Sequence, residues 1–411
     1  MYKLLKLTIV LSLVLASVPV LPALAQAENL CNYSGIHANG AKYCITLPPP
    51  GFWNGDLVIF AHGFVPVTEP VDIPWDQMNL PGGITLPVFA NSLGYAFATT
   101  SYSENGLAIV RGVIDILDLV EVFNDTVGTP NRVLLLGVSE GGLVTTLAVE
   151  KHPGVFDGGM ALCGPIGDFR GQINYFGDFR VLFDYFMPGL LPPSPVDIPQ
   201  NVVNNWDVFA FNIFLAISNP ANAAQVTQLL NVSQAPVDPA NPNTVAETTL
   251  GILRYNVLAT NNAKEKLNGQ PFDNQHRVYV GSFNDALLNL GVQRFTADKI
   301  PLNRIDKKYE TSGALKKPLV TMHTTGDPIV PYWHSTLYTG KAAANGKGGS
   351  YIPITVQRYG HCTFTLPEML NAFGALVFQT SGQALNTAGL PLNSAGANEF
   401  YNPAERAMPG K

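Results

Sequence analysis

Short apolar runs alternate with longer amphipathic stretches in two parts of the chain. The runs are five or six residues long and mostly apolar, which is typical of strands buried on both faces. Between them, apolar residues recur at helical spacing, as Val113, Ile116, Leu117 and Val120 do. We expect strands at 57–61, 95–100, 132–137, 158–163, 318–322 and 354–358, and helices within 74–93 and at 108–123, 141–152, 332–344 and 367–379.

This alternation predicts an α/β fold, a mostly parallel sheet with helices on both faces. The alternation stops near residue 164 and resumes near residue 316, and aromatic residues crowd positions 169–214 between these points. We therefore expect a core formed by 28–164 and 316–411, interrupted by a large, mostly helical cap insertion at 165–315. Residues from 383 onward are rich in Gly, Asn and Ala and predict an irregular extension.

The composition narrows the class of protein. The chain has 411 residues, of which 46% are hydrophobic and only 13% are charged. Disorder requires the opposite balance, with low hydrophobicity and high net charge. The net charge of −6 is also the wrong sign for the basic surface with which proteins bind nucleic acids.

Part of the apolar excess lies in a leader at residues 1–27. Lys3 and Lys6 precede the apolar run 7–15, and the segments 23–25 and 25–27 both fit a small-x-small cleavage site. This pattern predicts a secretory signal peptide cleaved near Ala25 or Ala27, and thus a secreted or periplasmic protein. An uncleaved membrane anchor is the alternative. No later segment holds 18 uninterrupted apolar residues, so we expect no transmembrane helix in the mature chain.

Four cysteines follow the leader: Cys31, Cys44, Cys163 and Cys362. An even number in an exported chain predicts disulfides, with three possible pairings. Cys31 and Cys44 flank an Asn-Gly pair at 39–40, a strong turn signal, so we expect these two cysteines to bond across a hairpin. The cysteines do not have the close spacing of a zinc site, and no metal is implied.

A G-x-S-x-G motif at 137–141 places Ser139 between a predicted strand and a predicted helix. A nucleophilic serine stands on such a sharp turn, where glycines avoid side-chain clashes. The start of the helix also brings positive partial charge close to a developing anion. The alternative is a helix-capping serine in a Gly-rich turn.

Two later loops supply candidates for the base and the acid that such a serine needs. Asp327 follows the strand at 318–322, and His361 follows the strand at 354–358. The order serine, acid, histidine is the one found with a nucleophile on a strand-to-helix turn. We expect His361 to take the serine proton and Asp327 to orient the imidazole.

The oxyanion of such a reaction needs two donors. One candidate is the backbone N–H of Glu140, which follows the serine. The other is the backbone N–H of Phe64, after the strand at 57–61, with that of Val65 as the near alternative. We expect His62 to shape this loop rather than to act as the base.

These features together resemble the α/β-hydrolase superfamily over residues 51–165 and 316–379. The resemblance implies a serine hydrolase without a metal or organic cofactor, with the insertion in the place of a family cap domain. A weaker resemblance to the tannase and feruloyl esterase family rests on Trp53-Asn54-Gly55 and His361-Cys362. In that family a cysteine directly before the nucleophile bonds the cysteine after the histidine.

In this chain Val138 occupies the position of that first cysteine. Cys163 ends a predicted strand at the same edge of the sheet, so we expect it to bond Cys362 instead. Two buried free thiols are the alternative.

The resulting hypothesis is a secreted serine hydrolase that cleaves a small-molecule or polymeric carboxylic ester. Some aromatic residues of the insertion are expected to line an apolar pocket over Ser139. One alternative is a peptidase or amidase of the prolyl-oligopeptidase type, which has the same order of triad residues but usually a large N-terminal propeller. The other is a non-catalytic binding protein with the same fold. The oligomeric state is not predicted.

Overall fold

The computed structural model describes residues 30–81, 83–387 and 400–401, the last two by their backbone alone. The expected leader at 1–27 lies outside the described residues, as does most of the expected extension after 383. Residues Phe400–Tyr401 form a short strand, β10, that pairs with β9 (Phe364–Thr365).

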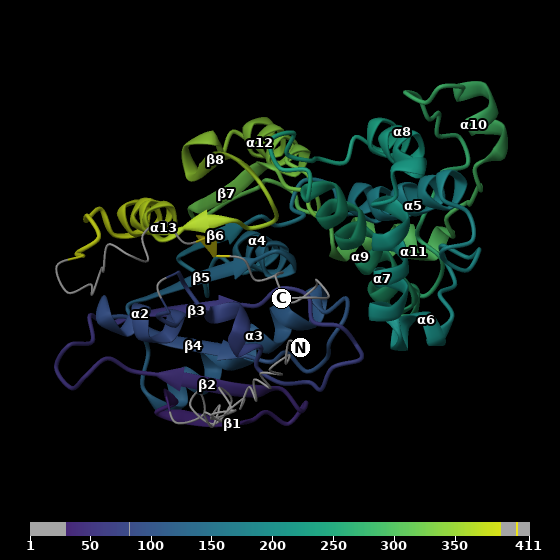
Figure 1. Ribbon diagram of the computed structural model, residues 1–411. Coiled ribbons are helices and arrows are strands. Elements are labelled where there is room, and N and C mark those ends of the chain that lie inside the picture. The colour runs from purple at the N-terminus through teal and green to yellow at the C-terminus, as the bar shows by residue number, and fades with distance from the viewer. Residues whose placement is uncertain (1–29, 82, 388–399, 402–411) are drawn as a thin grey trace, which may run out of the picture.

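The centre of the molecule is an eight-stranded sheet (Figure 1). Its strands are β1 (Tyr33–Ile36), β2 (Lys42–Thr46), β3 (Asp56–Ala61), β4 (Ala96–Thr100), β5 (Arg132–Val138), β6 (Gly158–Leu162), β7 (Leu319–Gly326) and β8 (Tyr351–Tyr359). They lie in the order β1-β2-β4-β3-β5-β6-β7-β8. All pairings from β4 to β8 are parallel, and β2 pairs antiparallel with both of its neighbours. The expected mostly parallel sheet is confirmed.

Helices cover both faces of the sheet, because alternate residues of its central strands enter two separate apolar cores. Leu57 and Ile59 belong to the apolar core that also contains residues of α3 (Ile109–Thr126), α4 (Glu140–Lys151) and α12 (Trp333–Ala344). On the opposite face, Val58 and Phe60 pack under α2 (Leu86–Ser92) and α13 (Leu366–Ser381).

The helix expected within 74–93 is instead two short pieces. The first is a 3₁₀ turn, η2 (Trp75–Met78), and the second is α2. The intervening sequence contains Pro81 followed by two glycines, which disfavour a continuous helix.

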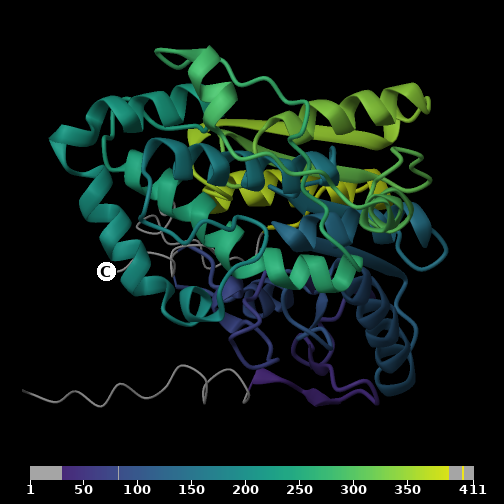
Figure 2. The ribbon, with the colours of Figure 1, turned by 90° about the vertical axis from the view of Figure 1, so that its right-hand side faces the viewer.

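Between β6 and β7 the chain forms a body that we call the helical segment (residues 169–308). It contains α5 (Phe169–Phe186), α6 (Gln200–Asn204), α7 (Trp206–Ile217), η3 (Pro220–Asn222), α8 (Ala223–Ser233), α9 (Thr244–Leu267), α10 (Asp285–Gly291) and α11 (Lys299–Lys308). The segment lies beside the sheet, as Figures 1 and 2 show from two directions. Most of its helices pack around an apolar core of their own, built on Phe179, Phe183 and Trp206 among others.

The N-terminal hairpin extends the sheet at its β4 edge. The disulfide expected between Cys31 and Cys44 is present, with the two Cα atoms 5.4 Å apart. The turn at 37–40 closes with a hydrogen bond from the N–H of Gly40 to the carbonyl of His37, and Gly40 has a φ of +92°. Among the described helices, none has the length and apolar character needed to span a membrane.

Candidate active site

Ser139 stands on a sharp turn between β5 and α4. Its φ is +54°, in the left-handed region that residues with a side chain rarely adopt. The glycines on either side are required by close packing. A Cβ on Gly137 would overlap the carbonyl oxygen of Gly141, and a Cβ on Gly141 would overlap the carbonyl oxygen of Ala61. The turn therefore presents the serine as the sequence motif predicts.

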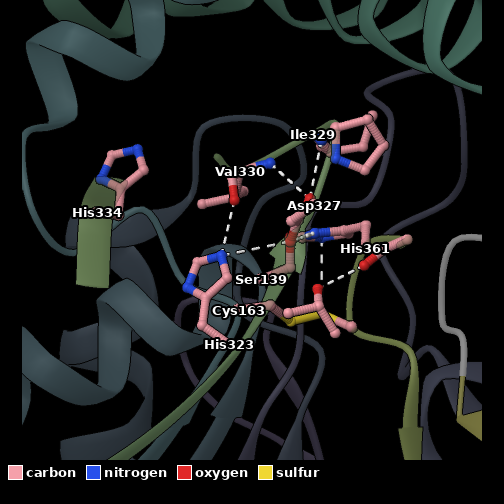
Figure 3. A network of polar contacts seen from close by, with 12 residues as sticks. Ser139, Cys163, His323, Asp327, Ile329, Val330, His334 and His361 are labelled. Carbon is pink, nitrogen blue, oxygen red and sulfur yellow. Dashed lines mark hydrogen bonds and ion pairs between the residues drawn. A yellow bond between two sulfur atoms is a disulfide. The ribbon is translucent and has the colours of Figure 1, made fainter. Parts of the chain in front are cut away.

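The three residues expected to form a triad come together at this turn (Figure 3). The Nε2 atom of His361 lies 2.9 Å from Oγ of Ser139, and its Nδ1 atom lies 2.7 Å from Oδ2 of Asp327. A carboxylate only accepts hydrogen bonds, so the Nδ1 atom carries the proton and the Nε2 atom is left to accept the serine proton. All three side chains are buried.

Strands β7 and β8 are longer than the sequence pattern predicts. Residues 323–326 extend β7 because they pair with 355–359 of β8, so Asp327 follows the strand directly. Beyond the strands, the N–H of Gly360 donates to the carbonyl of Gly326, and the hydroxyl of Thr324 donates to the carbonyl of Gly360. These bonds hold the loops of the acid and the histidine together.

Asp327 is fully buried, and its two oxygens have different partners. The Oδ1 atom accepts the backbone N–H groups of Ile329 and Val330, both at 2.9 Å. The Oδ2 atom faces His361 and also lies 3.4 Å from Nε2 of His323. Burial alone would raise the pKa of Asp327. The neighbouring His361 and the hydrogen bonds from His323 and His361 outweigh burial and lower the pKa to about 2. No motif in the sequence marks His323.

The predicted oxyanion donors flank Ser139. Glu140 is the first residue of α4, and the N–H of a first helical residue has no partner within its helix. On the other side of Ser139, the N–H of Gly63 donates a hydrogen bond to Oε1 of Gln77 at 2.7 Å. No acceptor among the described residues takes the N–H of Phe64. The loop is close to the serine, since a Cβ on Gly63 would lie 3.3 Å from Cβ of Ser139.

His62 lies behind this loop. Its ring stacks on Tyr102 with the centroids 3.8 Å apart, and its Nδ1 atom is 2.7 Å from the carbonyl oxygen of Gly63. Burial lowers the pKa of His62 to about 4, so the ring is neutral at physiological pH. These contacts fit a residue that shapes the loop.

Glu140 also places a buried carboxyl group beside the nucleophile, which the sequence motif does not indicate. Its Oε1 atom accepts the N–H of Ala108 at 2.8 Å. Burial raises the pKa of this carboxyl to about 8, although the bond from Ala108 opposes the shift. The Glu140 side chain is therefore mostly neutral at pH 7.

An apolar pocket opens at Ser139 between the core and the helical segment. Its empty volume, including the open space at its mouth, is about 900 Å³. Aromatic side chains make up much of its wall, namely Phe64, Phe169, Phe176, Tyr255 and Phe272. Of the aromatic residues crowded at 169–214, only Phe169 and Phe176 therefore line this pocket.

The disulfide expected between Cys163 and Cys362 is present and touches the triad. The sulfur of Cys362 lies 3.6 Å from Nε2 of His361, and both half-cystines have a positive φ. This bond joins the end of β6 to the loop of His361. Cys163, His361 and Cys362 are the described residues close enough to share a metal ion, but the disulfide leaves no thiolate to bind one.

The order of the strands and the serine on the turn after β5 define this chain as having the α/β-hydrolase fold. This is the fold that the sequence pattern predicts.

Comparisons with known proteins find only distant matches. No protein-family model matches the chain, and no curated protein is significantly similar to it. Among solved structures, Candida antarctica lipase A is 15% identical with a TM-score of 0.44, over 88% of this chain and 79% of the lipase. An esterase of Pyrococcus furiosus is 12% identical with a TM-score of 0.42, over 86% of this chain and 91% of the esterase.

An acylaminoacyl peptidase of Pyrococcus horikoshii is 13% identical with a TM-score of 0.38, over 80% of this chain. The match covers only 36% of that peptidase, so this chain spans little more than a third of it. At these identities and TM-scores the matches carry no information about the substrate.

The Cys163–Cys362 disulfide is expected to support activity, and the Cys31–Cys44 disulfide only stability. Replacing Cys163 and Cys362 together by alanine should lower kcat/KM by about 10-fold or more, because the loop of His361 loses its link to β6. The matched control replaces Cys31 and Cys44 and should lower Tm with little effect on kcat/KM. The kcat/KM of each double variant is measured at a temperature below its own Tm. Equal losses of kcat/KM in the two double variants would contradict a role at His361.

The raised pKa of Glu140 predicts how stability depends on pH. The folded chain holds this proton up to about pH 8, whereas the unfolded chain releases it near the ordinary value of 4.5. The contribution to stability is therefore complete at low pH and is lost as the pH rises through about 8. Between about pH 5 and pH 9, Tm should fall less in Glu140→Gln than in the wild type. As a control, replacement of the exposed Glu121 by Gln should leave the pH dependence of Tm as in the wild type. Parallel curves of Tm against pH for all three proteins would contradict the raised pKa of Glu140.

Proposed function

We propose that this chain is a serine hydrolase that cleaves carboxylic esters. The observation that carries the proposal is the position of His361, within hydrogen-bond distance of both Oγ of Ser139 and Oδ2 of Asp327. A nucleophile, a base and an orienting carboxylate in this arrangement are the groups that acyl transfer requires.

In the proposed reaction Ser139 attacks the ester carbonyl while His361 takes its proton. The N–H groups of Glu140 and Phe64 bind the oxyanion of the tetrahedral intermediate. His361 then gives the proton to the leaving alcohol, and an acyl-enzyme remains on Ser139. Water, activated by the same histidine, releases the acid and restores the enzyme. Asp327 holds the Nδ1 proton of His361 and stabilises the imidazolium that forms in each step.

The pocket supports an uncharged, apolar acyl or aromatic group as the substrate part that binds next to Ser139. Its wall is formed mainly by aromatic and aliphatic side chains, and the carboxyl of Glu140 is mostly neutral at pH 7. Burying a charged group in such a wall would cost free energy, and the described residues that line the pocket include no Lys, Arg or His to pair with an anion.

We also propose that residues 28–164 and 316–411 form the catalytic core and that 165–315 form a cap over the pocket. A secreted or periplasmic location is compatible with two disulfides, which persist in oxidising compartments.

The test of the nucleophile is Ser139→Ala. This variant should fold normally, lose labelling by a fluorophosphonate probe and hydrolyse p-nitrophenyl butyrate with a kcat lower by about 10⁴-fold or more. Ser92→Ala, on α2, is the control and should be labelled like the wild type. Near-normal turnover by Ser139→Ala would refute the assignment.

Esterase and amidase activity are separated by matched substrates. With p-nitrophenyl esters and p-nitroanilides of the same acyl groups, we expect kcat/KM to be far higher for the esters in the wild type. Efficient cleavage of the anilides would favour the peptidase alternative. A chain that is folded but neither labelled nor active on either series would be the binding protein.

A further inference from the structure

Most backbone polar groups of the loop that carries Asp327 have hydrogen-bond partners. We call residues 327–330 the acid loop. Three successive carbonyls in it each accept a hydrogen bond from a different side chain. The pairs are Pro328 with the hydroxyl of Tyr175 at 2.8 Å, Ile329 with Nε2 of Gln172 at 2.9 Å, and Val330 with Nε2 of His323 at 2.7 Å.

Two N–H groups of the same loop bind the carboxylate of Asp327 itself. Those of Ile329 and Val330 both donate to Oδ1 of Asp327 (Figure 3). The Asp327 carboxylate is thus bound to the backbone of the acid loop. The carbonyls of that same backbone are held by the three side chains. A shift of this backbone moves Oδ1, and with it the Oδ2 atom that contacts His361.

Two of the three donors, Gln172 and Tyr175, come from α5 of the helical segment, whereas His323 belongs to β7. The amide of Gln172 has a defined orientation, because its Oε1 atom accepts a hydrogen bond from Nε2 of His334 at 2.8 Å. The Nδ1 atom of His334 accepts the N–H of Gly167 at 3.0 Å, which leaves the Nε2 atom as the donor. Burial holds the pKa of His334 well below its usual range, so this arrangement persists at neutral pH.

We propose that Gln172 and Tyr175 are positioning residues for Asp327. Helix α5 then belongs to the catalytic machinery as well as to the wall of the pocket. This inference rests on the proposed function, because it assigns a role in a reaction that needs Asp327 at His361.

The physical reason is the cost of leaving a buried carbonyl without a donor. When the Tyr175 hydroxyl or the Gln172 amide is removed, the acid loop relaxes toward another partner. The Asp327–His361 contact lengthens or turns, and small displacements of catalytic groups lower rates strongly. If the two contacts only fastened α5 to the core, their loss would lower stability and leave kcat unchanged.

The main variant is Tyr175→Phe, which removes only the hydroxyl, and the second is Gln172→Met, which keeps the length of the side chain. The matched control is Tyr279→Phe. Its hydroxyl also donates to a residue of α5, Asp178, at 2.6 Å, but it is not bonded to the acid loop. All three variants lose a hydrogen bond made by α5 and should have a lower Tm.

The substrate is p-nitrophenyl acetate, whose acyl group is too short to fill the pocket. We expect kcat to fall about 10-fold in Tyr175→Phe and about 10- to 100-fold in Gln172→Met, with KM changed much less. Tyr279→Phe should keep the kcat of the wild type. Each variant should still be labelled completely by the fluorophosphonate, but Tyr175→Phe and Gln172→Met more slowly. Complete labelling shows that the loss of rate is not a loss of folded protein.

The split between kcat and KM gives a readout that a merely structural role would not move. In Tyr175→Phe and Gln172→Met the loss should fall on kcat, because a displaced Asp327 supports His361 less well during the reaction. The control should keep both the kcat and the KM of the wild type.

An unchanged kcat in both variants, with only a lower Tm, would overturn the inference and leave the proposed function intact. Full activity of Ser139→Ala would overturn the proposed function itself. The two failures are therefore distinguishable.

Discussion

The structure around the site depends on one fully buried carboxylate. A charge without solvent is tolerated only when hydrogen bonds and nearby groups replace its hydration. Asp327 receives two backbone N–H groups on one oxygen and two histidines on the other. This requirement explains the sharp fold of the acid loop, since its N–H groups turn inward to the carboxylate. Its carbonyls turn outward, and α5 and β7 supply the donors for them.

A second constraint is steric and acts at the opposite side of His361. Ser139 sits at a positive φ, and the packing of α4 against β5 and β3 leaves no room for a Cβ at Gly137 or Gly141. The serine therefore has a position set by the backbone. The loop of His361 is held close to this serine by the hydrogen bonds of Gly360 with Gly326 and Thr324 and by the Cys163–Cys362 disulfide. Rigid placement of this kind is what a hydrogen-bonded triad requires.

The parts of the site that could be predicted from the sequence are those with local signals. The six predicted strands follow from their mainly apolar runs, although β8 is partly exposed. Ser139 follows from its motif, and Asp327 and His361 from their places just after strands. Gln77, His323, Gln172 and Tyr175 carry no such signal. The contacts of Gln172 and Tyr175 join residues far apart in the chain, and only the folded topology brings them together. Gln77 and His323 contact residues closer in sequence, but no local pattern marks either contact.

The extent of β7 escaped prediction for a related reason. Residues 323–326 are polar or Gly and do not continue the apolar run that marks the strand at 318–322. Pairing with β8 makes them strand, and His323 is then buried behind Asp327 instead of lying in a surface loop. Tertiary pairing outweighs the local pattern at this point.

Two carboxyl groups close to Ser139 have opposite protonation states because their partners differ. Asp327 has several donors and a pKa of about 2, whereas Glu140 has one backbone donor, no cationic partner among the described residues and a pKa of about 8. In the proposed reaction negative charge develops on the oxyanion next to Glu140. An ionised Glu140 would repel that charge, and a neutral one does not. Separating the two pKa values by environment therefore gives the site one carboxylate that supports His361 and one carboxylic acid that leaves the oxyanion undisturbed.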